Sequence, residues 1–203
     1  MIASLASRVV RRSGFLLGLL LFLFLPFATA SCDVPAGVSV GRGGTFEESV
    51  AGLDLVRDSY NIRATDDMAS RPAVHSRLDR TYAIDSPVQW LAIAVVVVLV
   101  LGLATAQLRT QRVRDWLATA AAVVGIGLLV VTEVLTLRSL HDTASFFAVL
   151  SSDMPQFKHI NLADRVGEVV HIEVGFWLAL AALVPTLVAN AAPLLRRGNA
   201  RPG

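Results

Sequence analysis

Four long apolar runs dominate the chain, and each is long enough to form a helix that crosses a membrane. The runs cover residues 14–30, 88–107, 116–137 and 169–194, and polar, charged segments separate them. A helix rises about 1.5 Å per residue, so roughly 20 apolar residues cross about 30 Å of hydrocarbon. The pattern therefore predicts an all-α integral membrane protein with four transmembrane helices.

Arginines cluster on alternate sides of the apolar runs and predict the topology. The clusters precede the first run, fill the link between the second and third runs, and follow the fourth. They consist of Arg8, Arg11 and Arg12, of Arg109, Arg112 and Arg114, and of Arg196, Arg197 and Arg201. By the positive-inside rule all three clusters lie in the cytoplasm. Both termini are then cytoplasmic, and two segments lie outside.

The runs and the clusters together predict the organisation of the whole chain. The order is a cytoplasmic N-terminus (1–13), a first helix (14–30), an outer loop (31–87), a second helix (88–107), a cytoplasmic loop (108–115), a third helix (116–137), a second outer loop (138–168), a fourth helix (169–194) and a cytoplasmic tail (195–203).

The first outer loop is acidic and poor in large apolar residues. It holds nine acidic residues against six arginines, and four glycines lie between residues 36 and 45. Residues 45–57 alternate loosely, which fits either a short strand or a helical turn on the membrane surface. A segment with so few large apolar side chains buries little core by itself. We therefore expect a poorly structured loop that leans on the helices or on a partner.

The first run also has features of a signal peptide. It follows a basic stretch and ends in Ala28-Thr29-Ala30, the small-x-small pattern of a signal-peptidase site, and cleavage after Ala30 would leave three spanning helices. Cys32 allows a second form of processing, lipidation, although Thr29 occupies the place where lipoprotein signals carry an aliphatic residue. We favour an uncleaved anchor over either form of processing.

Composition supports a membrane location and excludes some partners. Charged residues make up 17% of the chain, the mean hydropathy is +0.61, and the net charge of +2 is too small to indicate nucleic acid as a partner. Because Cys32 is the single cysteine, an internal disulfide and a cysteine-only metal site are excluded. We expect a multi-pass protein of the cell membrane.

Short motifs at the start of the chain carry a resemblance. Leu25-Pro26-Phe27 and Ser31-Cys32-Asp33, followed by a glycine-rich gap and Gly52-Leu53-Asp54-Leu55, precede three further apolar runs. This layout resembles a group of small multi-pass membrane proteins of high-GC Gram-positive bacteria that have no assigned function. The resemblance implies a cell-membrane location and no activity.

Ionisable residues at membrane depth are candidates for a functional site, because burying one costs about 3 kcal/mol. Glu133 lies about one turn inside the outer end of the third run. Two histidines and a further glutamate lie at the same predicted level. The candidate metal ligands are Glu133, His141, Glu168 and His171, and the candidate haem ligands are His141 and His171. A proton relay through these groups is a third possibility.

The alternative interpretation of these residues is that helix ends near lipid headgroups ordinarily carry charges. Glu133 would then extend to the surface or pair with Arg138, and Glu168 and Glu173 would favour the N-terminal end of their helix. On a helix, His171 and Glu173 lie about 200° apart, which is poor geometry for shared ligation. We favour this interpretation and expect no cofactor.

Helix-packing patterns are the remaining signals. Gly14-xxx-Gly18 and Ala121-xxx-Gly125 permit close approach of helices, and Thr186 and Asn190 form part of a polar stripe expected to bond a neighbouring helix. The sequence holds no phosphate-binding glycine loop, nucleophile elbow or zinc-protease motif.

The function expected from these signals is that of a non-enzymatic accessory or scaffold subunit in the bilayer, associated with other membrane subunits or with itself. The alternative functions are a haem- or metal-binding redox protein that uses His141 and His171, or a sensor whose outer loop binds a ligand.

Overall fold

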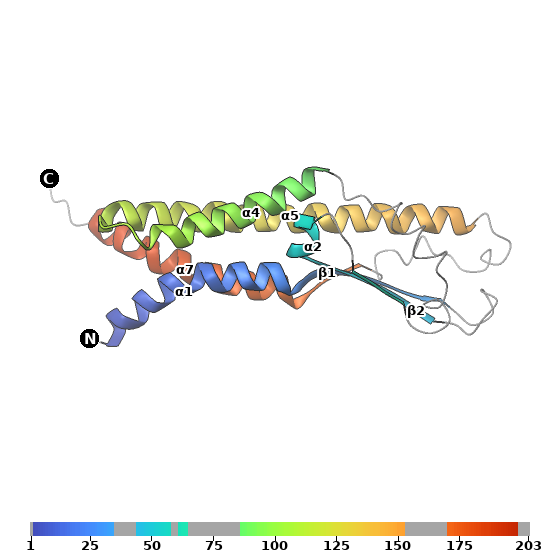
Figure 1. The fold of residues 1–203 in the computed structure, drawn as a ribbon, viewed down its shortest axis with the longest axis horizontal. Helices are drawn as coiled ribbons and strands as arrows, with labels where there is room; N and C mark the ends of the chain where they lie inside the picture. Colours follow the sequence, from blue (N-terminus) through green and yellow to red (C-terminus); the bar gives the residue numbers. More distant parts are fainter. Residues whose placement is uncertain (1, 35–43, 58–60, 65–85, 153–169, 199–203) are drawn as a thin grey trace.

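The computed structural model of the chain is a bundle of helices that carries a small antiparallel sheet at one end (Figure 1). The structure describes residues 2–34, 44–57, 61–64, 86–152 and 170–198. In chain order the elements are α1 (Ile2–Phe24), β1 (Pro26–Val34), β2 (Gly44–Ala51), α2 (Gly52–Arg57), β3 (Asn61–Ala64), α4 (Ser86–Thr105), α5 (Gln111–Ser152), β4 (Val170–Ile172) and α7 (Val174–Gly198).

Three helices are long and apolar enough to cross a membrane. They are Pro87–Thr105 in α4, Gln111–Asp142 in α5 and Val174–Leu195 in α7, whereas the apolar part of α1, Ser13–Phe24, is shorter. The second predicted helix agrees with α4 to within two residues at each end. The third is much longer than predicted, because the 42 residues of α5 extend over about 63 Å, roughly twice the thickness of the hydrocarbon layer.

The predicted limits of the first and fourth helices were wrong at the end of the bundle that carries the sheet. The first helix ends at Phe24 rather than Ala30, because Pro26 has no N–H to continue it and the chain enters β1. The fourth helix begins at Val174 rather than residue 169, because residues 170–172 pair with β1 as β4. Pro26, which the prediction placed inside the first helix, therefore starts a strand.

The helices pack through residues spaced alternately three and four apart. This spacing matches the seam of a left-handed bundle, in which neighbouring helices cross at about 20°. The buried positions are Val88, Ala92, Val95, Leu99 and Gly102 on α4, Ala118, Ala122, Gly125, Leu129, Thr132 and Thr136 on α5, and Phe176, Ala179, Leu183, Thr186 and Asn190 on α7.

The first glycine pair brings α1 close to α7, which confirms its predicted role in helix packing. A Cβ atom on Gly14 would overlap the Thr186 hydroxyl, and one on Gly18 would lie 3.0 Å from Leu183 Cδ2. The second predicted contact is looser, since a Cβ on Gly125 would lie 3.4 Å from Leu99 Cδ2 of α4. The contact of α1 with α7 is therefore tighter at its glycines than the contact of α5 with α4 at Gly125.

The sheet has the strand order β3-β2-β1-β4, with antiparallel pairing throughout. The chain is mostly helical, as predicted, but it is not all-α, and its first outer segment contains β2, α2 and β3 rather than only irregular structure. Gly52 packs against Phe22, and the Asp54 carboxylate accepts the N–H of Ala51 at 3.0 Å, which caps α2. The predicted glycine-rich gap falls mainly in residues 35–43, outside the described residues.

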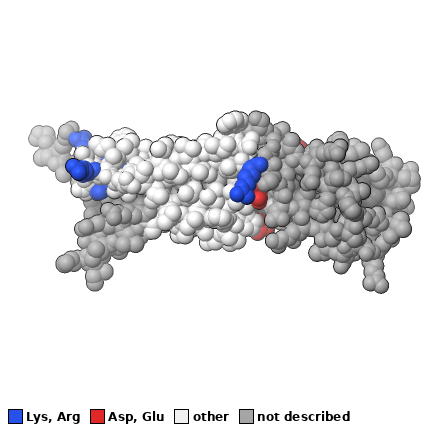
Figure 2. Space-filling view, viewed as in Figure 1, with Lys and Arg blue, Asp and Glu red and all other residues white. Residues whose placement is uncertain are grey.

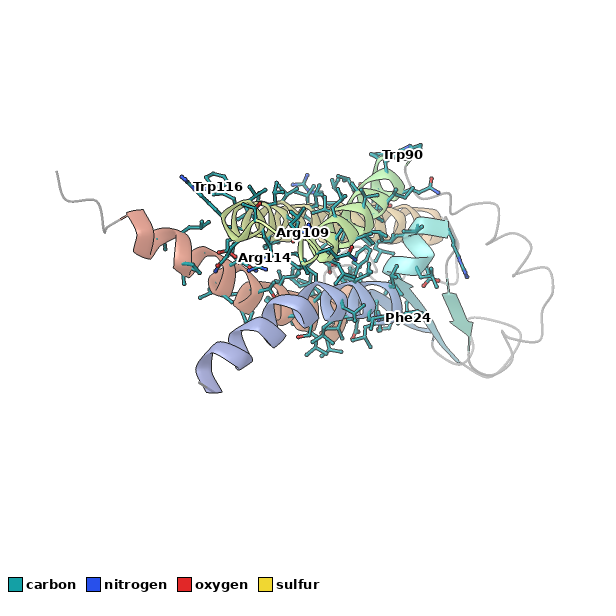
Figure 3. All side chains as sticks on the ribbon, turned by 60° about the vertical axis from the view of Figure 1, so that its left-hand side comes forward. Phe24, Trp90, Arg109, Arg114 and Trp116 are labelled. Carbon is teal, nitrogen blue, oxygen red and sulfur yellow. The ribbon has the colours of Figure 1, made fainter. Side chains whose placement is uncertain are left out.

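The bundle surface is apolar between two charged levels. On the face drawn in Figure 2, described arginine side chains lie at one end of the molecule and again near its middle, and a white band separates them. Trp116 marks one end of this band, and Phe24 and Trp90 mark the other (Figure 3). These tryptophans are 63% and 66% exposed. Exposed tryptophan at both edges of an apolar band is typical of a bundle that lies in a bilayer.

Candidate functional site

The candidate site lies where the bundle meets the sheet, around Glu133 of α5. Glu133 and its neighbour Thr132 are each only 3% exposed, and Thr136 is buried one turn farther along. Glu133 is eight residues, or about 12 Å, beyond the contact of Gly125 with α4. Since α5 also contacts α7, β1 and β4, this part of α5 is enclosed by the bundle and the base of the sheet.

Two polar atoms in this region have no hydrogen-bond partner within the described part of the chain. They are Glu133 Oε1 and Thr132 Oγ1, whereas the Thr136 hydroxyl donates to the carbonyl of Thr132 at 2.8 Å. A buried polar group that lacks a partner costs about 1–3 kcal/mol, and a charged group costs more. We therefore expect Glu133 to reduce the stability of the bundle that encloses it.

Glu133 does not extend to the surface as the alternative interpretation supposed. Its side chain is buried, whereas Arg138, the proposed partner, is exposed. The physical reason is the length of α5, which continues beyond the apolar band and keeps residue 133 inside the packed part of the molecule. Of the three candidate metal ligands within the described residues, Glu133 is buried, whereas His141 and His171 are exposed.

A second polar contact joins the sheet to the start of α7. The Thr29 hydroxyl of β1 donates to Glu173 Oε1, and the N–H of Glu173 donates to the carbonyl of Phe27 at 2.7 Å. The ring of Phe27 packs edge-on against Phe22 of α1 and Phe176 of α7, with centroid distances of 5.1 and 6.4 Å. The contact is thus anchored in an aromatic cluster from three elements.

His171 and Glu173 do not share a helix, as the predicted fourth helix had them do. His171 belongs to β4, opposite Thr29 in the strand register, and Glu173 is the single residue between β4 and α7. The helical angle of about 200° between His171 and Glu173 therefore does not apply.

The two histidines are nevertheless poorly placed for a haem. His141 of α5 and His171 of β4 are both exposed, whereas a haem or small-molecule site is an enclosed pocket. No group of three or more His, Cys, Asp or Glu side chains in the described residues is arranged to hold a metal ion. Glu168, the other predicted metal ligand, lies outside the described residues.

Both predicted processing residues lie in β1, and Ala30 has a strand partner on each side. Ala30 pairs with Glu48 of β2 on one side and Val170 of β4 on the other, and Cys32 pairs with Phe46. Ala28 and Thr29, which precede the predicted cleavage point, are buried. In the folded chain this segment is therefore an interior strand rather than an accessible loop.

Among the described residues, the polar stripe of α7 makes its hydrogen bonds within its own helix rather than to a neighbouring one. The Thr186 hydroxyl donates to the carbonyl of Ala182 at 2.8 Å, and Asn190 Nδ2 donates to the carbonyl of Thr186 at 2.8 Å. Both bonds run back along the same helix, as short polar side chains in helices commonly do. The small side chain of Thr186 explains the stripe better than a cross-helix bond does, because Thr186 packs directly against Gly14 of α1.

Sequence reasoning missed the contact between Thr29 and Glu173. The cleavage pattern accounts for Thr29, and the predicted fourth helix places Glu173 near its start, so neither prediction brings the two residues together. The available signal was the alternation of small apolar and polar residues from Ala28 to Asp33, which has the period of a strand.

Comparisons of the chain with protein-family models, curated proteins and solved structures found no match. The class that the fold defines is therefore a helical bundle with three helices of membrane-spanning length and an antiparallel sheet at one end.

Proposed function

We propose that the protein is a multi-pass protein of the cell membrane that retains α1 as a fourth spanning helix, with both termini in the cytoplasm. The sheet and the end of α5 then lie outside. Three observations support this arrangement: the arginine clusters, the exposed tryptophans at both edges of the apolar band, and the packing of α1 against the other helices.

The packing of α1 argues against its removal by signal peptidase. Phe15 and Phe22 are almost fully buried, and Phe15 lies against Gly102 of α4. Removing a buried phenylalanine side chain costs about 3–5 kcal/mol, and cleavage would remove both. Loss of α1 would also expose the α7 face around Leu183, so the uncleaved chain is the form in which the bundle is complete.

We further propose that the protein is a non-enzymatic accessory or scaffold subunit that presents its sheet to another membrane protein. The observation that carries this proposal is the direct continuation of helix into strand at two neighbouring places. A single residue, Leu25, separates α1 from β1, and a single residue, Glu173, separates β4 from α7. Because α1 contacts α7 and β1 pairs with β4, the sheet extends the helix pair and has a fixed position above the bundle.

The edge strand β4 of the sheet has a surface suited to a protein contact. Ile172 of β4 and Val174 at the start of α7 are exposed apolar residues at the end of the bundle that carries the sheet. Apolar residues at a rigid edge contribute to protein interfaces when polar residues surround them, and His171 is such a neighbour. The partner is thus expected to contact β4 and the first turn of α7.

The test is the quantitative identification of proteins that co-purify with the tagged chain from its native membrane in mild detergent. Its reference is an unrelated four-helix membrane protein with the same tag. A partner at a fixed ratio is expected, and Ile172→Ser should reduce its recovery. Val123→Ser is the matched control, because Val123 is also an exposed apolar residue but lies on α5, away from β4. Failure to recover a partner above the reference level would contradict the accessory role, as would equal recovery with both variants.

A further inference from the structure

The link between α4 and α5 forms a compact basic surface at the end of the bundle opposite to the sheet. This surface, the arginine turn, comprises residues 108–117. Arg109 and Arg112 are exposed, whereas Arg114 is 31% exposed and its Nε lies 3.8 Å from Asp115 Oδ1. Asp115 is fully buried and is the only acidic residue in the segment, so the turn carries a net charge of +2.

Apolar side chains alternate with these arginines. Leu108, Val113, Trp116 and Leu117 are all exposed, although each has a large hydrophobic side chain. In Figure 3, Arg109, Arg114 and Trp116 lie at the same end of the bundle. An exposed surface of this composition fits the boundary between headgroups and acyl chains, where apolar groups enter the hydrocarbon and guanidinium groups reach phosphate oxygens.

The sequence of the C-terminal end of α7 is also basic. The C-terminal end of α7 lies beside the arginine turn in Figure 1, and its last residues include Arg196 and Arg197. At the end that carries the sheet, by contrast, the exposed Arg57 and Arg138 have acidic residues close by in sequence, Asp54 and Asp142 respectively. Within the described residues, the arginines at the sheet end thus have acidic neighbours in sequence, whereas the arginine turn has a net positive charge.

We propose that the arginine turn binds the headgroup of an anionic phospholipid. Arg109 and Arg112 contact the phosphate oxygens, since guanidinium groups match phosphate geometry with two parallel hydrogen bonds. The buried Asp115 restrains Arg114 beside them, and Trp116 anchors the adjoining acyl region. This site depends only on the bundle lying in a bilayer, so it does not rest on the accessory role proposed above.

The experiment uses the tryptophan at the site as the reporter. In a chain that carries Trp90→Phe and Trp177→Phe, Trp116 is the remaining tryptophan. The purified chain is placed in mixed micelles with brominated phosphatidylglycerol or brominated phosphatidylcholine, which quench tryptophan on contact. We expect stronger quenching by the anionic lipid. Each arginine near a membrane surface contributes about 1 kcal/mol, so each Arg→Gln change should weaken the preference about fivefold.

The matched variants remove the same charge from opposite ends of the bundle. Arg109→Gln with Arg112→Gln should abolish most of the preference, whereas Arg57→Gln with Arg138→Gln should leave it unchanged. If the double variant of the turn does not fold, as judged by circular dichroism, Arg109→Gln alone should show the fivefold loss. Equal quenching of the parent chain by both lipids would overturn the proposal. It would also be overturned by an equal loss in both double variants, or by displacement of the lipid with inorganic phosphate at the same concentration.

Discussion

Replacement of Gly14 by alanine is the sharpest test of the packing between α1 and α7. The added Cβ atom would overlap Thr186 Oγ1, and it would lie 3.0 Å from Thr186 Cβ and 3.3 Å from the carbonyl oxygen of Ala182. The hydroxyl is held in place by its 2.8 Å hydrogen bond to that same carbonyl. The methyl group therefore requires α1 to move away from α7 or Thr186 to change rotamer.

The expected loss of stability follows from these contacts. Overpacking by one methyl group costs about 1–3 kcal/mol, and the better helix propensity of alanine offsets up to about 1 kcal/mol. Gly14→Ala should thus lower the free energy of unfolding by about 1–2 kcal/mol, or roughly five- to thirtyfold in the equilibrium constant. Reversible unfolding in mixed micelles with increasing denaturing detergent, followed by circular dichroism, measures the change.

Two further variants separate a steric effect from a general effect of alanine. Thr186→Ala removes the overlapping hydroxyl and should change stability by about 0.5 kcal/mol or less. Its combination with Gly14→Ala should recover at least about 1 kcal/mol, because the two residues are in contact. Gly127→Ala is the matched control, since no atom lies within 4 Å of an added Cβ there. Equal effects of Gly14→Ala and Gly127→Ala, or strict additivity in the double variant, would refute the reasoning.

Three other predictions concern the junction between bundle and sheet. Glu133→Leu should raise the free energy of unfolding by about 1–3 kcal/mol in the same assay, because it removes a buried carboxyl with an unpartnered oxygen. A decrease would instead show that another group stabilises the carboxyl. Thr29→Val should speed hydrogen exchange of the β4 amides by about tenfold or more, because it removes the hydrogen bond from Thr29 to the Glu173 carboxylate, and such a bond contributes about 1.5–3 kcal/mol. Unchanged exchange would mean that this hydrogen bond does not hold β4 in place. The intact mass of the protein purified from its native membrane should include residues 1–30, and an N-terminus at Ser31 would contradict retention of α1.

The helices were predictable because their signal is local. Each apolar run of about 20 residues identifies a helix without knowledge of its neighbours, and the spacing of Gly14 and Gly18 identifies a contact face. The helix that faces this pair was not predictable, because the sequence does not indicate which of the three other apolar helices packs against Gly14 and Gly18. In the structure it is α7, through Thr186 and Leu183. The burial of Glu133 likewise depended on tertiary contacts of α5 with α7, β1 and β4.

The sheet was missed because its first and last strands adjoin apolar helices. Residues 26–30 and 170–172 continue the apolar runs of α1 and α7, so a hydropathy profile includes them in the helices. The alternation that distinguishes a strand is weak in Ala28, Thr29 and Ala30, because alanine is small and tolerated in both structures. The pairing of β1 with β2 and β4 therefore decides the conformation here.

The same continuity explains why the bundle and the sheet should behave as one unit. β1 is the central neighbour of β2 and β4 and also the extension of α1, so a displacement of α1 along its axis would shift the register of both strand pairs. A register shift of one residue reverses which side chains face each side of a sheet. Thr29 would then lose Glu173, and Phe27 would leave its position between Phe22 and Phe176. The closely packed contact of α1 with α7 thus fixes the register of the sheet as well as the packing of the bundle. A change at Gly14 should therefore be detectable in the hydrogen exchange of β4, beyond the C-terminal end of α1.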